Sequence, residues 1–218
     1  MPRQVSADKP RLTVTGTAGG KTYRGILFDL DGVLCHTDRL HYEAWSELCD
    51  QLGLQFNETL NGRLRGVSRT ESFKLILRAN SIAMSDAEID LWTSRKNELY
   101  LALVERLTPS DSDPAILAML DRLHHKGLLC AVASSSKNAR TIMNRLGLTS
   151  RIDAVADGND ITRSKPDPQV FLMAARRLGL PCGDCLAVED ARSGIDAALA
   201  GGIDCAATGD ALGYEKAT

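Results

Sequence analysis

Short apolar runs alternate with amphipathic stretches along most of this chain. Runs with the length and composition of buried strands lie at 25–28, 128–133, 152–156, 185–188 and 203–207. Between these runs, apolar residues recur at helical spacing over 115–126, 137–146, 168–178 and 193–200. Strands and helices that alternate in this way form parallel sheets with right-handed crossovers. The pattern therefore predicts an α/β fold with a Rossmann-like, doubly wound parallel sheet.

The segment between the first two predicted strands has helical periodicity and little strand character. Apolar positions recur every four residues from Leu40 to Leu52, and Gly53 stands where that helix should end. Ser85 and Glu88 have the spacing of a capping box at the start of another helix. We predict an inserted helical cap subdomain at 36–109, a core domain made of 25–35 and 110–218, and an N-terminal tail at 1–24.

The predicted N-terminal tail is polar and lightly basic. Five cations against one acid give residues 1–24 a net charge of +4, and no apolar signal-peptide core is present. We expect a disordered tail here, with a transit peptide as the alternative. At the other end, the chain stops soon after the strand predicted at 203–207, so we expect that edge of the sheet to be less covered.

The composition excludes several classes of partner. The chain has 218 residues, a net charge of -2, and 44% hydrophobic and 25% charged residues. A net charge so close to zero gives no electrostatic basis for binding nucleic acid or an anionic membrane surface. No apolar run approaches the ~20 residues that a membrane-spanning helix needs. We expect a monomer that acts on a small molecule, a sugar phosphate by the resemblance described below.

The six cysteines are scattered, mostly inside apolar runs. This placement favours buried free thiols in a reducing compartment over a disulfide framework, so we expect a cytoplasmic protein. Cys182 and Cys185 have the spacing of a redox motif or of half a zinc site, but no second pair completes a zinc site. We predict no function for this pair.

Two aspartates follow the first predicted strand. Asp29 and Asp31 are separated by one residue and precede Gly32. Residues i and i+2 of an extended chain project to the same side, so the two carboxylates converge. Converging carboxylates repel each other unless a cation lies between them, and Mg²⁺ bound through oxygens is the usual solution. Taken alone, the pair has an Asp-Gly turn as its structural alternative.

Polar side chains follow three further strands of the predicted sheet, at the edge where such sheets bind ligands. Hydroxyls and amides after 128–133 open a helix and suit a phosphate group, with a plain serine N-cap as the alternative. A lysine next to two prolines and an adjacent acid pair follow the next two strands. These residues are Ser134, Ser135, Ser136, Lys137, Asn138, Lys165, Glu189 and Asp190. Together with the two aspartates, they predict a phosphoryl-transfer site.

In this order and spacing, the motifs resemble those of the haloacid dehalogenase superfamily of phosphotransferases, over residues 25–209. The resemblance implies that Asp29 is the nucleophile, which becomes an aspartyl-phosphate, and that Asp31 is the general acid/base. It implies that Ser134 and Lys165 hold the transferring phosphoryl group. It also implies a Mg²⁺ cofactor, held by Asp29, the backbone carbonyl of Asp31, Asp190 and Glu189.

The helical insertion resembles the cap of the β-phosphoglucomutases within this superfamily. Thr37 and His41 match the hinge-side pattern of that group, 64–69 matches its cap substrate loop, and Lys96 lies in a third matching segment. The resemblance implies that β-D-glucose 1-phosphate and glucose 6-phosphate are interconverted through β-glucose 1,6-bisphosphate. A sugar-phosphate phosphatase is the alternative, followed by a phospholigand-sensing domain without catalysis. The implied substrate-binding residues are Thr37, His41, Arg65, Gly66, Arg69, Ser72 and Lys96 in the cap, and Ser134, Ser135, Ser136, Lys137, Asn138 and Lys165 in the core.

A bisphosphorylated sugar carries phosphate at both ends, so an enzyme that binds it needs a second anion-binding site in the cap. Arg69 would bind the second phosphate through its bidentate guanidinium, with Lys96 nearby. The structural alternative for Arg65, Arg69 and Lys96 is a solvated cationic helix face. For His41 the alternative is a satisfied interior histidine.

Overall fold

The computed structural model describes residues 12–14, 21–64 and 67–209. The chain forms two compact units, one made of Met1–Cys35 with Thr108–Thr218 and the other of His36–Leu107. The second unit ends two residues before the boundary predicted for the cap, at 109. The sheet lies in the first unit, and the described residues of the second unit are helices and their connections.

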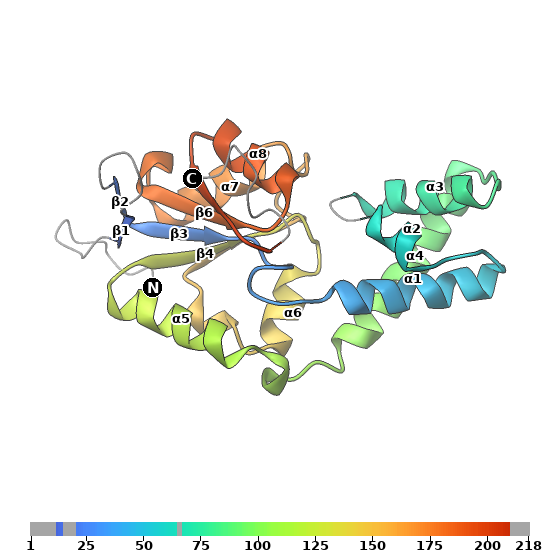
Figure 1. The fold of residues 1–218 in the computed structure, drawn as a ribbon, viewed down its shortest axis with the longest axis horizontal. Helices are drawn as coiled ribbons and strands as arrows, with labels where there is room; N and C mark the ends of the chain where they lie inside the picture. Colours follow the sequence, from blue (N-terminus) through green and yellow to red (C-terminus); the bar gives the residue numbers. More distant parts are fainter. Residues whose placement is uncertain (1–11, 15–20, 65–66, 210–218) are drawn as a thin grey trace. The chain divides into compact units, whose positions relative to one another are not determined.

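A five-stranded parallel sheet forms the centre of the first unit (Figure 1). In order across the sheet, the strands are β5 (Ala154–Ala156), β4 (Leu129–Ala133), β3 (Gly25–Phe28), β6 (Cys185–Glu189) and β7 (Asp204–Ala207). The chain adds strands first on one side of β3 and then on the other, so the strand order reverses at β3. Ligands of such sheets bind outside the carboxyl ends of the strands at this reversal. The predicted doubly wound α/β fold is confirmed.

Helices cover both faces of this sheet (Figure 1). One face carries α5 (Pro114–His125) and α6 (Ala139–Arg145), and the other carries α7 (Gln169–Leu178) and α8 (Arg192–Ala200). Three short 3₁₀ turns also lie in this unit: η1 (Pro109–Asp111), η2 (Thr149–Arg151) and η3 (Cys182–Asp184). The bounds of these strands and helices lie within two residues of those predicted, because hydrophobic periodicity is a local property of the chain.

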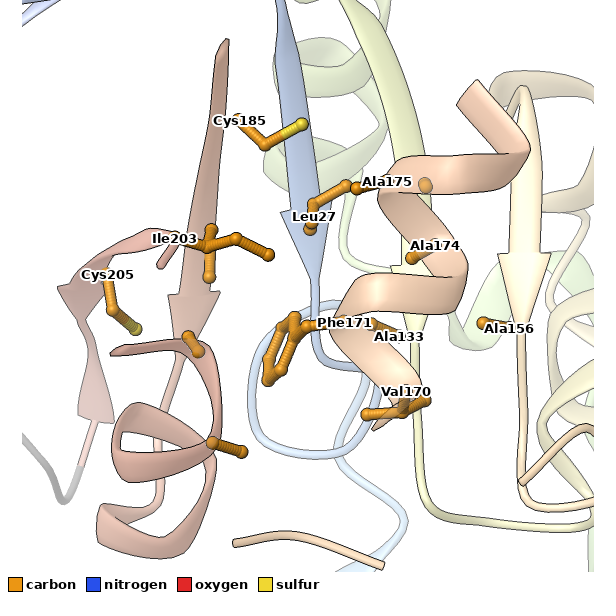
Figure 2. Close-up of a cluster of buried hydrophobic side chains, with 14 of the residues drawn as sticks. Leu27, Ala133, Ala156, Val170, Phe171, Ala174, Ala175, Cys185, Ile203 and Cys205 are labelled. Atoms are coloured by element: carbon orange, nitrogen blue, oxygen red, sulfur yellow. The ribbon is translucent and has the colours of Figure 1, made fainter. Parts of the chain in front are cut away.

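The apolar face of α7 is central to the core on its side of the sheet (Figure 2). Val170, Phe171, Ala174 and Ala175 recur at helical spacing and are fully buried. Phe171 belongs to the same cluster as Leu27 of β3, and burying such a side chain contributes about 1.5–3 kcal/mol to folding. The small alanines let the helix approach the strands closely. The carboxyl edge of the sheet is therefore built on a rigid scaffold.

The structure differs from the predicted disordered tail at the described residues before β3. β1 (Leu12–Val14) and β2 (Lys21–Tyr23) form an antiparallel pair. Tyr23 is 4% exposed, its hydroxyl donates to Asp204 Oδ2 at 2.6 Å, and Lys21 also contacts this carboxylate. These contacts order the segment against the first residue of β7, a partner that no local pattern reveals. Among the described residues, β7 is the outermost strand on its side of the sheet.

The second unit contains the helices α1 (Asp38–Leu52), α2 (Glu58–Gly62), α3 (Arg69–Ala79) and α4 (Asp86–Val104). The helix α4 packs against α1 and α3. Gly53 ends α1 with φ at 65°, a conformation that favours glycine. The predicted capping box is confirmed, because the Ser85 N–H donates to Glu88 Oε2 at 2.8 Å and Ser85 Oγ accepts from the Glu88 N–H.

All six cysteines are free thiols, including Cys182 and Cys185, as the sequence predicted. Four of them are buried. In the described part of the chain, no helix is both long and apolar enough to cross a membrane.

Candidate active site

The first site begins where β3 ends. Phe28 is paired with Val132 of β4 and with Val188 of β6, so the residues that follow these three emerge at one edge. The Asp29 N–H donates to the Val188 carbonyl at 3.0 Å, which continues the ladder by one residue. Sheet register therefore places Asp29 beside Glu189, although 160 positions separate them in the sequence.

Lys165 lies between these two carboxylates. Its Nζ contacts both Asp29 Oδ1 and Glu189 Oε1, and its side chain is only 9% exposed. Its ammonium also lies 4.8 Å from the centre of the Phe171 ring. Two buried carboxylates hold this buried ammonium in a fixed position. A positive charge fixed in this way can stabilise an anionic group that binds beside it.

Burial and neighbouring charges shift the pKa values of Asp29 and Lys165. Burial raises the pKa of Asp29 to about 7; the Lys165 ammonium opposes this, and Glu189 and Asp31 add to it. Burial alone lowers the pKa of Lys165, but the carboxylates of Asp29 and Glu189 outweigh that effect and raise it. Lys165 is therefore a permanent cation at neutral pH.

Asp190 completes a group of acids with Asp29 and Glu189. One potential ligand atom from each residue lies within 4.8 Å of the others. Gly32, with φ at 85°, makes room for Asp190, because a Cβ there would lie 1.9 Å from Asp190 Oδ2. Three carboxylates facing one ammonium leave an excess of negative charge, and oxygen-only ligands suit a hard cation such as Mg²⁺. The residues therefore fit the cofactor that the sequence predicted.

Asp31 is half-buried and is not part of this acid group among the described residues. Its Oδ1 lies 3.8 Å from Cys35 Sγ, and the two residues form an isolated β-bridge. The expected role of its backbone carbonyl as a metal ligand stays a prediction.

The serine loop, residues 134–138, joins β4 to α6 at the same edge. Ser134 is buried, and its Oγ accepts from the Ser136 N–H at 3.1 Å. Ser135 Oγ accepts from the Lys165 N–H at 3.4 Å, so this loop also contacts the lysine segment. Asn138 is the N-cap of α6, and its N–H donates to Ser136 Oγ at 3.2 Å, so one serine of the loop does bond the start of the helix, as the structural alternative expected. Lys137 is exposed.

Gly194 is a member of this site that sequence reasoning missed. A Cβ on Gly194 would lie 1.8 Å from Glu189 Oε1, so only glycine leaves room for that carboxylate. Glu189 Oε2 accepts from the N–H groups of Asp190 and Ala191, which orients its other oxygen toward Lys165. A glycine inside a predicted helix is the signal that could have revealed this close approach.

A second group of polar residues lies inside the helical unit. Lys96 is 2% exposed, and its Nζ lies 2.7 Å from His41 Nδ1. This ammonium also lies over the rings of Trp45 and Tyr100, at 5.0 and 4.8 Å from their centres. Lys96 is therefore not on a solvated helix face, contrary to the structural alternative for that residue. An ammonium only donates, so we assign His41 Nδ1 as the acceptor.

Tyr100 is a further residue that the sequence did not indicate. Its ring stacks on His41, with centroids 4.1 Å apart, and its hydroxyl lies 3.0 Å from Thr37 Oγ1. It is 1% exposed. Tyr100 thus links Thr37, His41 and Lys96, three predicted substrate-binding residues, through contacts that span 63 positions of the chain.

The other predicted cap residues have varied positions. Arg69 begins α3 and is half-buried; burial lowers its pKa, and its charge acts on His41. Ser72 is buried, and its hydroxyl donates to the Val67 carbonyl at 3.4 Å. The predictions for Arg65 and Gly66 lie outside the described residues.

We expect His41 to make the folded protein sensitive to acid. Burial, followed by the charges of Lys96 and Arg69, holds the pKa of His41 well below its usual value. The unfolded chain therefore binds an extra proton below about pH 6.5, and the free energy of unfolding falls by up to about 1.4 kcal/mol per pH unit as the pH drops. Urea denaturation at pH 7, 6 and 5 checks this.

The matched variants are His41→Gln and His36→Gln. His41→Gln should reduce the loss of stability between pH 7 and pH 5, whereas His36 is exposed and its replacement should leave that loss as it is. An equal pH dependence in the native chain and in His41→Gln would contradict the expectation.

Comparisons of sequence and structure relate this chain to known proteins. Residues 23–202 match the family model described as haloacid dehalogenase-like hydrolase. The chain is 37% identical to a β-phosphoglucomutase of Bacillus subtilis (strain 168) over 182 residues, which cover 83% of this chain and 80% of the relative. It is 29% identical to a fructose-1-phosphate phosphatase of Escherichia coli (strain K12) over 184 residues, covering 84% of this chain and 94% of the relative. Among solved structures, a β-phosphoglucomutase from Clostridium difficile matches with a TM-score of 0.80 and 32% identity, over 89% of this chain and 88% of that one.

Proposed function

We propose that this chain, which belongs to the haloacid dehalogenase-like hydrolases, interconverts β-D-glucose 1-phosphate and glucose 6-phosphate. The observation that carries the proposal is the buried Lys96, paired with His41 in the helical unit. A phosphatase needs one cationic group that binds phosphate, and Lys165 would be that group in the core. A mutase handles a sugar with phosphate at both ends, so a second cationic group is what it requires in addition.

The reaction consists of two phosphoryl transfers. Asp29 carrying a phosphoryl group donates it to the 6-hydroxyl of β-glucose 1-phosphate, while Asp31 takes the proton of that hydroxyl. The new O–P bond forms as the bond to Asp29 breaks, giving β-glucose 1,6-bisphosphate. Asp29 then attacks the 1-phosphate, and Asp31 returns the proton to the departing sugar oxygen. Glucose 6-phosphate leaves, and Asp29 carries a phosphoryl group again.

The basic residues of the core would reduce the repulsion in these steps. Lys165 would hold the anionic phosphoryl oxygens close to the carboxylate that attacks them, with hydroxyls of the serine loop donating to the same oxygens. Asp29, Glu189 and Asp190 would hold Mg²⁺, with the Asp31 carbonyl as a predicted fourth ligand. When bound, Mg²⁺ supplies positive charge that offsets the negative charge of the phosphoryl group.

A product assay tests the proposal. The chain is incubated with Mg²⁺, β-glucose 1-phosphate and a trace of glucose 1,6-bisphosphate as primer, and both glucose 6-phosphate and free phosphate are measured. We expect glucose 6-phosphate in large excess over phosphate, with the α-anomer converted much more slowly. Release of phosphate without glucose 6-phosphate would contradict the mutase proposal.

A sugar-phosphate phosphatase is the second candidate. The relative from Escherichia coli favours it, because that protein's name describes the removal of phosphate from fructose 1-phosphate. In that case water, not a sugar hydroxyl, attacks the aspartyl-phosphate. The ratio of the two products in the same assay separates these functions.

A further inference from the structure

We propose that residues 157–160, the loop directly after β5, are a positioning element that holds the serine loop and Lys165 at a fixed separation. The inference rests on the proposed function, because these two segments would grip the transferring phosphoryl group. Asn159 and Asp160 are the residues that we assign to this role. In the proposed phosphoryl transfers, neither residue contacts the substrate, and both act through the serine loop and Lys165.

The 157–160 loop is bonded to the serine loop along its backbone. The Gly158 N–H donates to the Ser136 carbonyl at 3.1 Å, and Asn159 Nδ2 donates to the Lys137 carbonyl at 2.8 Å. A Cβ on Gly158 would lie 2.4 Å from the Ser135 carbonyl oxygen, so glycine is needed for this approach. The serine loop therefore rests directly on the 157–160 loop.

Two carboxylates brace the loop from inside. Asp157 is fully buried; its Oδ1 accepts from the Asn159 N–H at 2.9 Å. Its Oδ2 lies 2.8 Å from Arg140 Nε, as an ion pair without the alignment of a hydrogen bond. Asp160 Oδ2 accepts from the Asp157 N–H at 3.0 Å, which closes the turn.

Asp160 also joins two helices. It accepts from Arg177 of α7 through both oxygens, at 2.6 and 2.7 Å, and from Arg140 of α6 at 3.2 Å. Arg177 holds the pKa of Asp160 well below its ordinary value. Both arginines also donate to the carbonyl of Val155, the middle residue of β5.

The two arginines that pair with Asp160 lie on the helices that follow the serine loop and Lys165. Arg140 lies just after the serine loop, and Arg177 lies on the helix that follows Lys165. A single carboxylate thus fixes the two helices that continue from the two proposed phosphate-binding segments. Misplacing reacting groups by about 1 Å can slow a reaction by about 100-fold, so small displacements here have large effects.

Two variants and one control test the inference. Asp160→Asn removes the charge between the two arginines, and Asn159→Ala removes one donor to the serine loop from an exposed side chain. Asp121→Asn is the matched control, because Asp121 pairs with Arg151 through two bonds of 2.8 and 3.3 Å and lies outside both proposed phosphate-binding segments. For each variant we measure the binding of inorganic phosphate, the kcat and KM, and the thermal midpoint.

We expect phosphate affinity and kcat to fall about 10-fold in Asp160→Asn and about 3-fold in Asn159→Ala, in line with the loss of a charged and a neutral hydrogen bond. Asn159→Ala should keep the thermal midpoint of the native chain, and Asp121→Asn should keep its phosphate affinity and kcat. Unchanged phosphate affinity and unchanged kcat in both loop variants would overturn this inference and leave the proposed function standing. If the native chain binds no phosphate and turns over no sugar phosphate, the proposed function fails and this inference fails with it.

Discussion

Replacing Asp29 with asparagine should reduce turnover of β-glucose 1-phosphate on the order of 10⁴-fold or more, as is found when a catalytic nucleophile is removed. An amide oxygen does not form the acyl-phosphate that the proposed reaction passes through. The shape of the side chain is kept, and Lys165 retains its contact with Glu189, so the fold should persist. The loss should therefore lie in chemistry.

Two measurements distinguish a chemical loss from an unfolded protein. Asp29→Asn should still bind inorganic phosphate, because one negative charge that repels the anion has been removed. Mass spectrometry after incubation with a phosphoryl donor should show a phosphorylated native chain and no phosphorylated variant. Asp184→Asn is the control, since the Asp184 side chain pairs with Arg24 at a partly exposed position. Turnover close to the native rate in Asp29→Asn would remove this residue from the mechanism.

Replacing Lys165 with methionine should affect both activity and stability. Loss of a preorganised charge facing the phosphoryl group should lower kcat by about 10²–10³-fold. The carboxylates of Asp29 and Glu189 would then be buried without their ammonium, and removing one partner of a buried pair costs about 3–5 kcal/mol. Denaturation without added metal should show this as a lower free energy of unfolding.

Lys21→Met is the matched control for this loss. Lys21 is half-exposed, and it pairs with Asp204 at the opposite end of the sheet, where such pairs contribute about 0–1 kcal/mol. It should keep native activity. A Lys165→Met variant with native kcat would show that the lysine serves the fold alone.

The carboxyl edge of the sheet shows how far sequence reasoning reaches. A buried strand is a short apolar run, and parallel strands present their ends at one edge, so Asp29, Lys165 and Glu189 were expected close together. The structure brings these three into contact. No role was predicted for the polar residues 157–160, although they follow β5, a strand that was predicted equally well.

Residues that act through long-range contacts were not predictable in this way. Tyr100 has the appearance of one more apolar position on a helix, and its contacts with Thr37 and His41 depend on how α1 packs against α4. Lys21 and Tyr23 of β2 likewise contact Asp204, which lies far along the chain.

By itself, the sequence determined the order of strands and helices, the doubly wound sheet and the acids, serines and lysine at its edge. Each of these follows from local periodicity and from a general rule about parallel sheets. The tertiary structure alone decided which charges are buried. Lys96 is an ordinary cation in a helical pattern, and only packing against Trp45, His41 and Tyr100 removes it from water. Burial depends on residues distant in the chain, and the lower dielectric around a buried charge strengthens its attraction to a ligand of opposite charge.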